Sequence, residues 1–320
     1  MTNQAAHHTA GPKVEGILRD ELLREDSGAS VVVPILRHLV SGQNNSLFSD
    51  EILARVRGML GSLCSALLDE LAQAATSAAG DRGDEEDAAA LQASLMANSA
   101  LMAHLHAIAL EWQLTERLQH QLAIDPIVSP LVQTLISTED ADLRDIAMRF
   151  LGAQARWCQL QRRMDYPLEE LSEEHLRTAL AAMAALAQAR SLPPERVVVA
   201  ETRIRDRYDE GATRLGLAAR LILGLDADVK AIHSLGEAGP ALFLSALAYS
   251  SGQRRDALVS ATHENQLARF ALSLRAMGLY GTDLEREFQT FHPELLLPAG
   301  FEDISSETAK AMLHAGAREV

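Results

Sequence analysis

The sequence predicts an all-α protein, with a bundle of long helices in its N-terminal half and an array of shorter helix pairs after it. From Val14 onward, apolar residues recur at intervals of three and four, as on one face of a helix. No segment alternates polar and apolar residues over a useful length, so strands are not expected. Hydrophobic residues make up 48% of the 320 residues but aromatic residues only 4%, which predicts a mainly aliphatic core.

Long helices are expected in residues 14–166, after a polar tail at residues 1–13 that we expect to be disordered. Ser49 or Asp50 can cap the N-terminus of one long helix. Residues 80–87, which follow that helix, are charged, contain two glycines and lack apolar side chains. This composition predicts an exposed acidic linker.

Two further long helices are expected after the linker. The first runs from about Glu86 to Trp112, and its first acidic side chains favour the positive end of the helix dipole. Two prolines then interrupt the apolar pattern. The second helix begins after the polar residues 137–140 and ends near residues 165–167, where a proline follows an aspartate and a tyrosine.

Shorter helices are expected in residues 167–320. The β-branched run at residues 197–199 follows two prolines and Glu195, a helix-start signal, so we interpret it as helix rather than strand. Three times, an apolar helix ends at a glycine and is followed by a short helix that ends near a histidine. The glycines are Gly224, Gly252 and Gly278, and the histidines are His233, His263 and His292. Stacked units of this kind form a curved array with a long surface suited to binding other chains.

One stretch of this second half resembles a known family. The segment Gly239-Pro240-Ala241-Leu242-Phe243-Leu244-Ser245-Ala246-Leu247-Ala248, together with its continuation through residues 257–259 to residues 274–279, carries the resemblance in its apolar and glycine positions. These positions resemble the closing repeats of the bacterial family called domain of unknown function 2336. The resemblance covers about the last third of the chain. It implies a HEAT-like array and a bacterial origin, and it supplies no catalytic or binding residues.

The charge and the cysteine content restrict the partners and the compartment. A net charge of −15 repels phosphate backbones and anionic lipid surfaces, so nucleic acid is not expected as a partner. The two cysteines are far apart and lack a Cys-x-x-Cys spacing, which favours a reducing compartment. No stretch approaches the roughly 18 apolar residues of a membrane-spanning helix, and the N-terminus lacks an apolar signal segment. We therefore expect a cytoplasmic protein.

The sequence offers no catalytic or metal-binding motif. The nucleophile, phosphate-loop and zinc-protease motifs are absent, and Cys64 and Cys158 are interpreted as small buried hydrophobic residues. His104 and His106 are two residues apart, so on a helix they point about 200° apart and cannot bind one ion together. Together with Glu111 they are expected on an ordinary polar helix face. No cofactor, metal or catalytic residue is predicted.

Two groups of arginines near aromatic residues are the candidate binding residues. Arg156, Arg162 and Arg163 surround Trp157, and Arg203, Arg205 and Arg207 lie just before Tyr208. Arginine and aromatic side chains often anchor protein interfaces or hold an anion. The competing interpretation is that nearby acidic side chains neutralise these arginines at the surface. Those acidic residues are Glu169, Glu170, Glu173, Asp206, Asp209 and Glu210.

Three functions are consistent with these observations. The leading hypothesis is a non-enzymatic protein-binding scaffold or regulatory adaptor, because helix pairs occur together with an absence of catalytic motifs. The alternative is a helical protein that binds a small molecule or lipid tail in an apolar pocket. The third is an enzyme of an unrecognised all-helical class, in which polar side chains would converge on one cavity. Another protein is the expected partner, and no oligomeric state is predicted.

Overall fold

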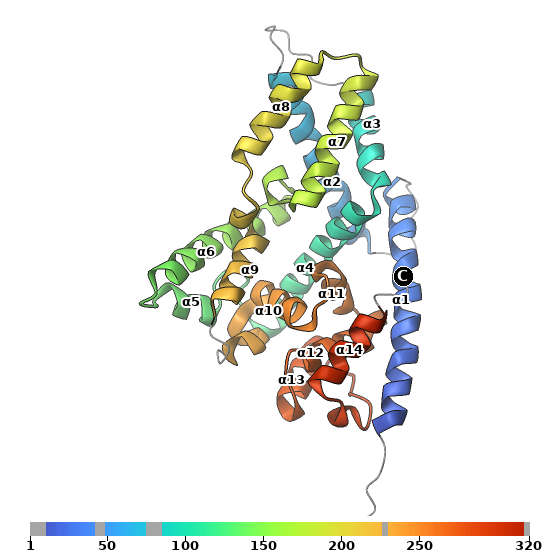
Figure 1. Cartoon of the computed structure of the whole chain (residues 1–320), viewed down its shortest axis with the longest axis vertical. Helices are drawn as coiled ribbons and strands as arrows, with labels where there is room; N and C mark the ends of the chain where they lie inside the picture. Colours follow the sequence, from blue (N-terminus) through green and yellow to red (C-terminus); the bar gives the residue numbers. More distant parts are fainter. Residues whose placement is uncertain (1–10, 42–48, 75–84, 226–229, 317–320) are drawn as a thin grey trace, which may run out of the picture. The chain divides into compact units, whose positions relative to one another are not determined.

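The computed structural model describes residues 11–41, 49–74, 85–225 and 230–316, and these residues are all-α (Figure 1). They form fourteen α-helices, joined by loops and short 3-10 turns, and no strand. The helices are α1 (Gly11–Ser41), α2 (Asp50–Gln73), α3 (Glu85–Ala97), α4 (Ser99–Leu122), α5 (Pro130–Ile136), α6 (Ala141–Arg162), α7 (Glu173–Ala189), α8 (Pro194–Arg207), α9 (Arg214–Gly224), α10 (Leu235–Ser251), α11 (Arg255–Ala261), α12 (Leu267–Ala276), α13 (Gly281–Phe291) and α14 (Ser306–Gly316).

Most of the predicted tail and linker falls outside the described residues. These outside parts are residues 1–10 of the tail and residues 80–84 of the acidic linker. Residues 11–13 of the predicted tail begin α1, and Glu85 to Asp87 form the acidic first turn of α3. The three carboxylates of that turn stabilise the positive end of the helix dipole, as the sequence predicts.

Several predicted helix starts are confirmed by capping side chains. Ser49 Oγ accepts a hydrogen bond from the backbone N–H of Ile52 at 3.3 Å, at the start of α2. Asp140 Oδ1 accepts two backbone N–H bonds, each 3.0 Å long, at the start of α6. The β-branched run 197–199 lies within α8, so its interpretation as helix is confirmed. At α2 and α6 a short polar side chain accepts from N-terminal backbone N–H groups, whereas the proline at the first position of α8 removes one of these donors.

The single long helix predicted from Glu86 to Trp112 is wrong. The chain forms α3 and α4 instead, with a bend of 93° between them. Asn98 lies at the break, and its side-chain oxygen accepts a hydrogen bond from Leu101 N at 2.8 Å, which starts a new helix. Short α5 is a further helix that the sequence prediction omits, although Ser129 and Pro130 supply its start signal.

The pair α3 and α4 also has the length and apolar composition of a membrane span when the two helices are taken together. Among the described residues, no single helix is long and apolar enough to cross a membrane.

The chain folds into two compact units. Of the described residues, those in 11–31 and 230–316 belong to unit 1 and those between 32 and 225 belong to unit 2. The boundary predicted between residues 166 and 167 lies within unit 2. Helix α1 contributes its first part to unit 1 and its last residues to unit 2.

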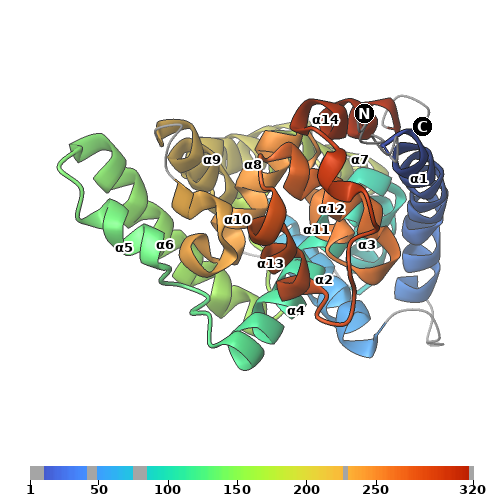
Figure 2. The same cartoon turned by 90° about the horizontal axis from the view of Figure 1, so that it is seen from below.

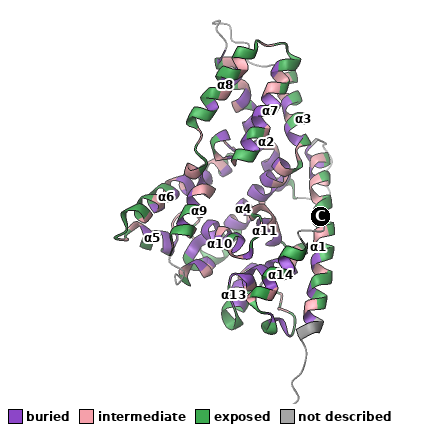
Figure 3. Cartoon of the chain, viewed as in Figure 1, coloured by how far each residue is buried: buried purple, intermediate pink, exposed green. Residues whose placement is uncertain are grey.

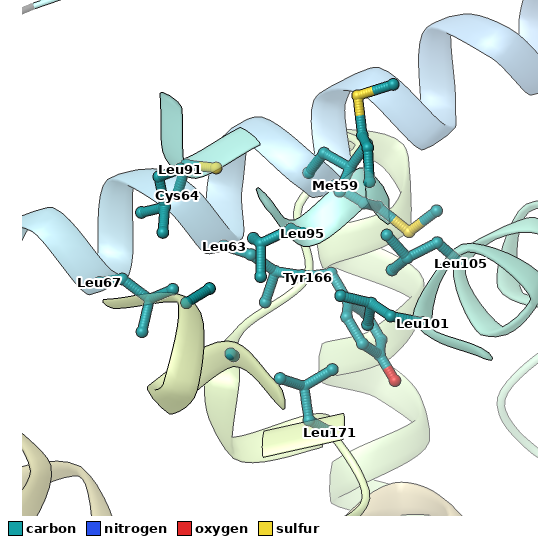
Figure 4. Close-up of a cluster of buried hydrophobic side chains, with 14 of the residues drawn as sticks. Met59, Leu63, Cys64, Leu67, Leu91, Leu95, Leu101, Leu105, Tyr166 and Leu171 are labelled. Atoms are coloured by element: carbon teal, nitrogen blue, oxygen red, sulfur yellow. The ribbon is translucent and has the colours of Figure 1, made fainter. Parts of the chain in front are cut away.

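Unit 2 has the aliphatic core that the composition predicts. Helix α2 contacts α3, α4, α7 and α8, and its buried leucines face those of α3 and α4. Figure 4 shows Leu63 from α2 beside Leu95, and Leu101 next to the ring of Tyr166. On another side of unit 2, α6 packs between α5 and α9, and Figures 1 and 2 both show α5 beside α6.

Unit 1 is organised around α12, which contacts α10, α11, α13 and α14. Its core is more aromatic than the overall composition suggests. The ring of Phe270 lies 4.6 Å from Phe291 and 6.2 Å from Phe288, and Phe243 stacks 6.0 Å from Phe291, measured between ring centroids. These rings come from α10, α12 and α13 and join the three helices.

Four helix N-termini are capped by glutamates from distant parts of the chain. Glu170 accepts from the first N–H of α9 at 2.9 Å, and Glu210 accepts from the first N–H of α7 at 3.2 Å. In unit 1, Glu287 accepts from Leu235 N at the start of α10, and Glu25 accepts from two N–H groups at the start of α12. Helices α10 and α12 have no side-chain cap of their own, so the distant carboxylates replace it.

Candidate functional site

The candidate binding residues fall into three groups by environment. Trp157 is buried, Arg205, Arg207 and Tyr208 have hydrogen-bond partners, and the remaining arginines are exposed. Arg156, Arg162, Arg163 and Arg203 are exposed and have no ion pair within the described residues, whereas Arg205 and Arg207 are exposed but paired. Two arginines of the second group are therefore paired, and none of the first group is.

Trp157 is 2% exposed and belongs to an internal network of unit 2. The guanidinium carbon of Arg214 lies 4.1 Å from the centre of the Trp157 ring. Arg214 also donates two hydrogen bonds to the carboxylate of Glu111, at 2.8 and 2.9 Å. On its other side, Trp157 meets Trp112 edge to face, with 5.7 Å between ring centroids. Trp157 is therefore not part of the surface.

Arg214 and Glu111 are both 1% exposed, so each requires the other's charge. Burial lowers the pKa of Arg214, but the charge and hydrogen bonds of Glu111 raise it, and the net shift is upward. Arg214 is therefore charged. Bidentate pairing and the face of Trp157 replace the water that the guanidinium loses on burial. The network fixes the packing of α4, α6 and α9.

The prediction that His104, His106 and Glu111 lie on a polar helix face is wrong, because all three are buried in unit 2. His104 Nε2 lies 2.9 Å from Tyr166 Oη, and its ring stacks on His175 with 4.6 Å between centroids. These partners lie far along the chain, so the sequence does not reveal them. Within the described ranges, no group of three or more His, Cys, Asp or Glu side chains is placed to hold a metal ion.

Arg207 and Tyr208 agree with the competing interpretation, in which nearby groups satisfy these side chains. Arg207 Nη2 donates to Glu70 Oε1 at 2.5 Å, and its Nε lies 3.6 Å from Glu169. Tyr208 Oη donates to the carbonyl of Leu171 at 3.0 Å, and burial raises the pKa of Tyr208 to about 12. The strongest partner, Glu70, lies 137 residues away and is not among the acidic residues that the sequence singles out.

The arginines of α6 form a different arrangement. Arg156 and Arg162 are exposed on this helix, Arg163 is exposed at its C-terminal cap, and Arg149 joins them from the preceding turns. None of the four forms an ion pair with another residue of the described ranges. Figure 3 shows that α6 exposes one side and buries the other.

We use the name arginine row for Arg149, Arg156 and Arg163, which recur at seven-residue intervals. Seven residues make nearly two helical turns, so these side chains share one face and follow each other at about 10 Å. Positive charge near the C-terminus of α6 is also favoured by the helix dipole, which accounts for Arg163 in part. Arg149 and Arg156 lie in earlier turns, where the helix dipole does not stabilise a positive charge. Arg149 is not among the sequence candidates, although its spacing from Arg156 is visible in the sequence.

A small cavity in unit 2 has a volume of about 130 Å³. It is lined by Leu68, Leu71, Asp87, Leu186, Arg190, Leu192 and Arg196. Arg190 forms an ion pair with Asp87, and Arg196 Nε donates to the carbonyl of Leu71 at 2.5 Å. The volume is below the range of roughly 300–1,000 Å³ that is typical of ligand pockets.

Both cysteines are buried and lack an activated environment. Burial raises the pKa of the Cys64 and Cys158 thiols to about 11, so neither forms a thiolate readily. Their interpretation as buried hydrophobic residues is confirmed. Comparisons of the chain with protein-family models, with curated proteins and with solved structures found no match.

Proposed function

We propose that the chain is a non-enzymatic protein-binding scaffold or regulatory adaptor whose partner docks on the arginine row of α6. The observation that supports this proposal is a set of exposed arginines that have no ion pair within the described residues, in a molecule of net charge −15. Arg207 and Arg205 in the same unit do have acidic partners. The arginine row therefore retains its capacity to bind carboxylates.

The chemistry of arginine favours a protein partner over a phosphate polymer. A guanidinium can bind a carboxylate through two parallel hydrogen bonds, which gives both energy and orientation. The negative charge of the whole molecule repels long phosphate chains and anionic lipid surfaces at a distance. A protein with a local acidic patch avoids most of that repulsion.

The architecture and location that the sequence predicts belong to the same proposal. We propose a HEAT-like array of helix pairs in residues 167–320, supported by the resemblance of residues 239–279. The helices in this part are 7 to 17 residues long, whereas α1, α2, α4 and α6 have 22 to 31 residues. We also propose a cytoplasmic location, which is supported by the cysteine usage.

Affinity capture from the native cell tests the proposal. The row variant R149E/R156E/R163E reverses three exposed charges and removes no ion pair among the described residues. We expect the full-length wild-type chain to recover at least one reproducible protein that the row variant recovers much more weakly. Circular dichroism of both proteins verifies that the row variant keeps its helices.

A control variant tests whether capture depends on the arginine row or on any reversal of three exposed positive charges. The substitutions R220E/R254E/K310E reverse three exposed positive charges elsewhere in the chain, at residues that are not binding candidates and that also lack ion pairs within the described residues. The control variant is expected to recover the same proteins as wild type. Equal capture by the wild-type and row variants would contradict the proposal, as would loss of capture by the control variant alone.

A further inference from the structure

The outer face of α6 mixes small, apolar and polar residues along one line. Six residues lie there at alternating intervals of three and four, so they share one face of the helix, which we call the seam. They are Asp145, Met148, Gly152, Ala155, Gln159 and Arg162. Each lies at least partly exposed, and Met148 is 55% exposed. The arginine row runs beside this seam, at the flanking position that usually carries interhelical charges.

The composition of the seam indicates what can pack on it. Gly152 and Ala155 are small and let another backbone approach closely, and Met148 is flexible enough to adapt to a partner. Asp145 and Gln159 are polar, so burial of apolar surface alone cannot hold a partner here. The flanking charges must contribute much of the affinity.

We infer that the partner presents an acidic α-helix, with a glutamate or aspartate at every seventh residue facing the arginine row. The inference rests on the proposed function and names the chemistry of its partner. In paired helices, flanking charges of one helix meet opposite charges of the other. Three arginines at about 10 Å intervals match carboxylates with the same helical repeat. On a straight α-helix, residues seven positions apart are offset by about 20° around the helix axis. A small left-handed supercoil compensates for this offset.

A second copy of this chain does not fit the row. No helix in the described ranges has two acidic residues separated by seven positions. The acidic charge of the molecule is instead distributed over many helix starts and loops. Because no helix of the described ranges offers the complementary row, we infer that another protein supplies it.

Two synthetic helical peptides of identical composition test the inference with the full-length chain. In the first peptide, three glutamates recur every seventh residue; in the second, the same residues are permuted so that the glutamates surround the helix. Fluorescence anisotropy at low salt measures the dissociation constants, and circular dichroism verifies that both peptides are helical. The first peptide should bind about tenfold more tightly, since each exposed ion pair contributes at most a few-fold in affinity.

Exchanging the charges of the row and of the peptide distinguishes a loss of charge pairing from a loss of folding, because a misfolded variant would not gain a new binding preference. The row variant R149E/R156E/R163E should lose the preference for the first peptide and should bind a peptide with lysines at the same three positions. The control variant should behave as wild type. Equal affinity of wild type for both glutamate peptides, or failure of the lysine peptide to bind the row variant, would overturn the acidic-helix inference.

The outcomes distinguish this inference from the proposed function. If affinity capture still differs between wild type and the row variant but the peptides show no preference, the adaptor proposal stands and the acidic helix is wrong. If capture does not differ, both are wrong. Self-association of wild type that the row variant abolishes, measured by light scattering, would replace the acidic partner by a second copy.

Discussion

The pair Arg214 and Glu111 illustrates how a buried charge depends on its partner. Both side chains lie in the interior of unit 2 on different helices, and each would be costly there alone. The two hydrogen bonds to Glu111 and the face of the Trp157 ring stabilise the buried positive charge of the guanidinium. The sequence cannot reveal such a pair, because its members are 103 residues apart.

Substitution of Glu111 by glutamine should destabilise unit 2 by about 3 kcal/mol, because it leaves the charge of Arg214 buried without a counter-charge. Urea unfolding followed by tryptophan fluorescence measures this, since Trp157 lies against Arg214 and contacts Trp112. The double variant E111L/R214M should lose less stability, because no charge then remains in the interior. A loss below about 1 kcal/mol for E111Q would contradict a role of the pair in holding the fold.

Gly58 allows a close approach that the sequence alone does not explain. A Cβ at this position would lie 2.6 Å from Met164 Cβ and 2.9 Å from Met164 O. Met164 itself has a φ of 58°, so its backbone is held in the left-handed region. Helix α2 can pack against this turn only through a residue without a side chain.

Substitution of Gly58 by alanine should therefore destabilise unit 2 by about 1–3 kcal/mol through overpacking. Gly61 is the matched control, because it lies three residues further along the same helix and a Cβ there would have no neighbour within 4 Å. Its substitution by alanine should stabilise the helix by up to about 1 kcal/mol. Changes of the same sign in the two variants, measured by urea unfolding, would show that the contact with Met164 is unimportant.

At the scale of elements, distant glutamates complete several helix starts. Local caps such as Ser49 and Asp140 are visible in the sequence, and the helices they begin are predicted correctly. The starts of α10 and α12 depend on Glu287 and Glu25 instead. Such caps follow from tertiary packing, so a sequence pattern locates these helices but does not show what stabilises their ends.

Glu25 provides a pH-dependent test of this capping. Burial raises the pKa of Glu25 from its ordinary 4.5 to about 7, although two backbone N–H groups and Arg269 oppose the shift. The folded chain therefore binds the proton more tightly than the unfolded chain. The contribution that burial of the protonated Glu25 makes to stability is fully present below about pH 4.5 and is lost as the pH rises through 7, so this pH dependence reports the burial of the capping carboxyl group.

The variant E25Q removes this titration. We expect the free energy of unfolding of wild type, minus that of E25Q, to decrease as the pH is raised from about 5 to 8. Hydrogen exchange of the α12 amides measures it, because the two tryptophans of the chain lie in unit 2 and do not report on unit 1. A difference that is constant or that increases with pH would contradict the raised pKa.

At the scale of the whole molecule, the composition predicts an acidic, helical chain with an aliphatic core, and unit 2 has that core. The candidate site is predicted only in part. Arg156, Arg162 and Arg163 are exposed as the interface hypothesis requires, but the tryptophan that drew attention to them is buried. Whether an arginine finds a partner depends on contacts over long sequence separations, as Arg207 and Glu70 show.

The local ion pairs between the arginine row and an acidic partner predict the salt dependence of binding. Exposed charge pairs are screened over about 8 Å at physiological ionic strength and over a shorter distance at higher salt. Capture of the partner by wild type should therefore weaken markedly when the salt concentration is raised from about 0.05 to 0.5 M. Capture that is insensitive to salt would indicate an apolar interface and would contradict a charge-based one.

Chemical footprinting of the arginines tests the central claim, that the arginine row is the binding face, most directly. A dicarbonyl reagent modifies accessible guanidinium groups, and mass spectrometry measures the extent at each arginine in the free chain and in the captured complex. We predict protection of all three arginines of the row, with unchanged modification of Arg220 and Arg254, the two arginines substituted in the control variant. Equal modification of the row in both states, or protection confined to the control arginines, would contradict the claim.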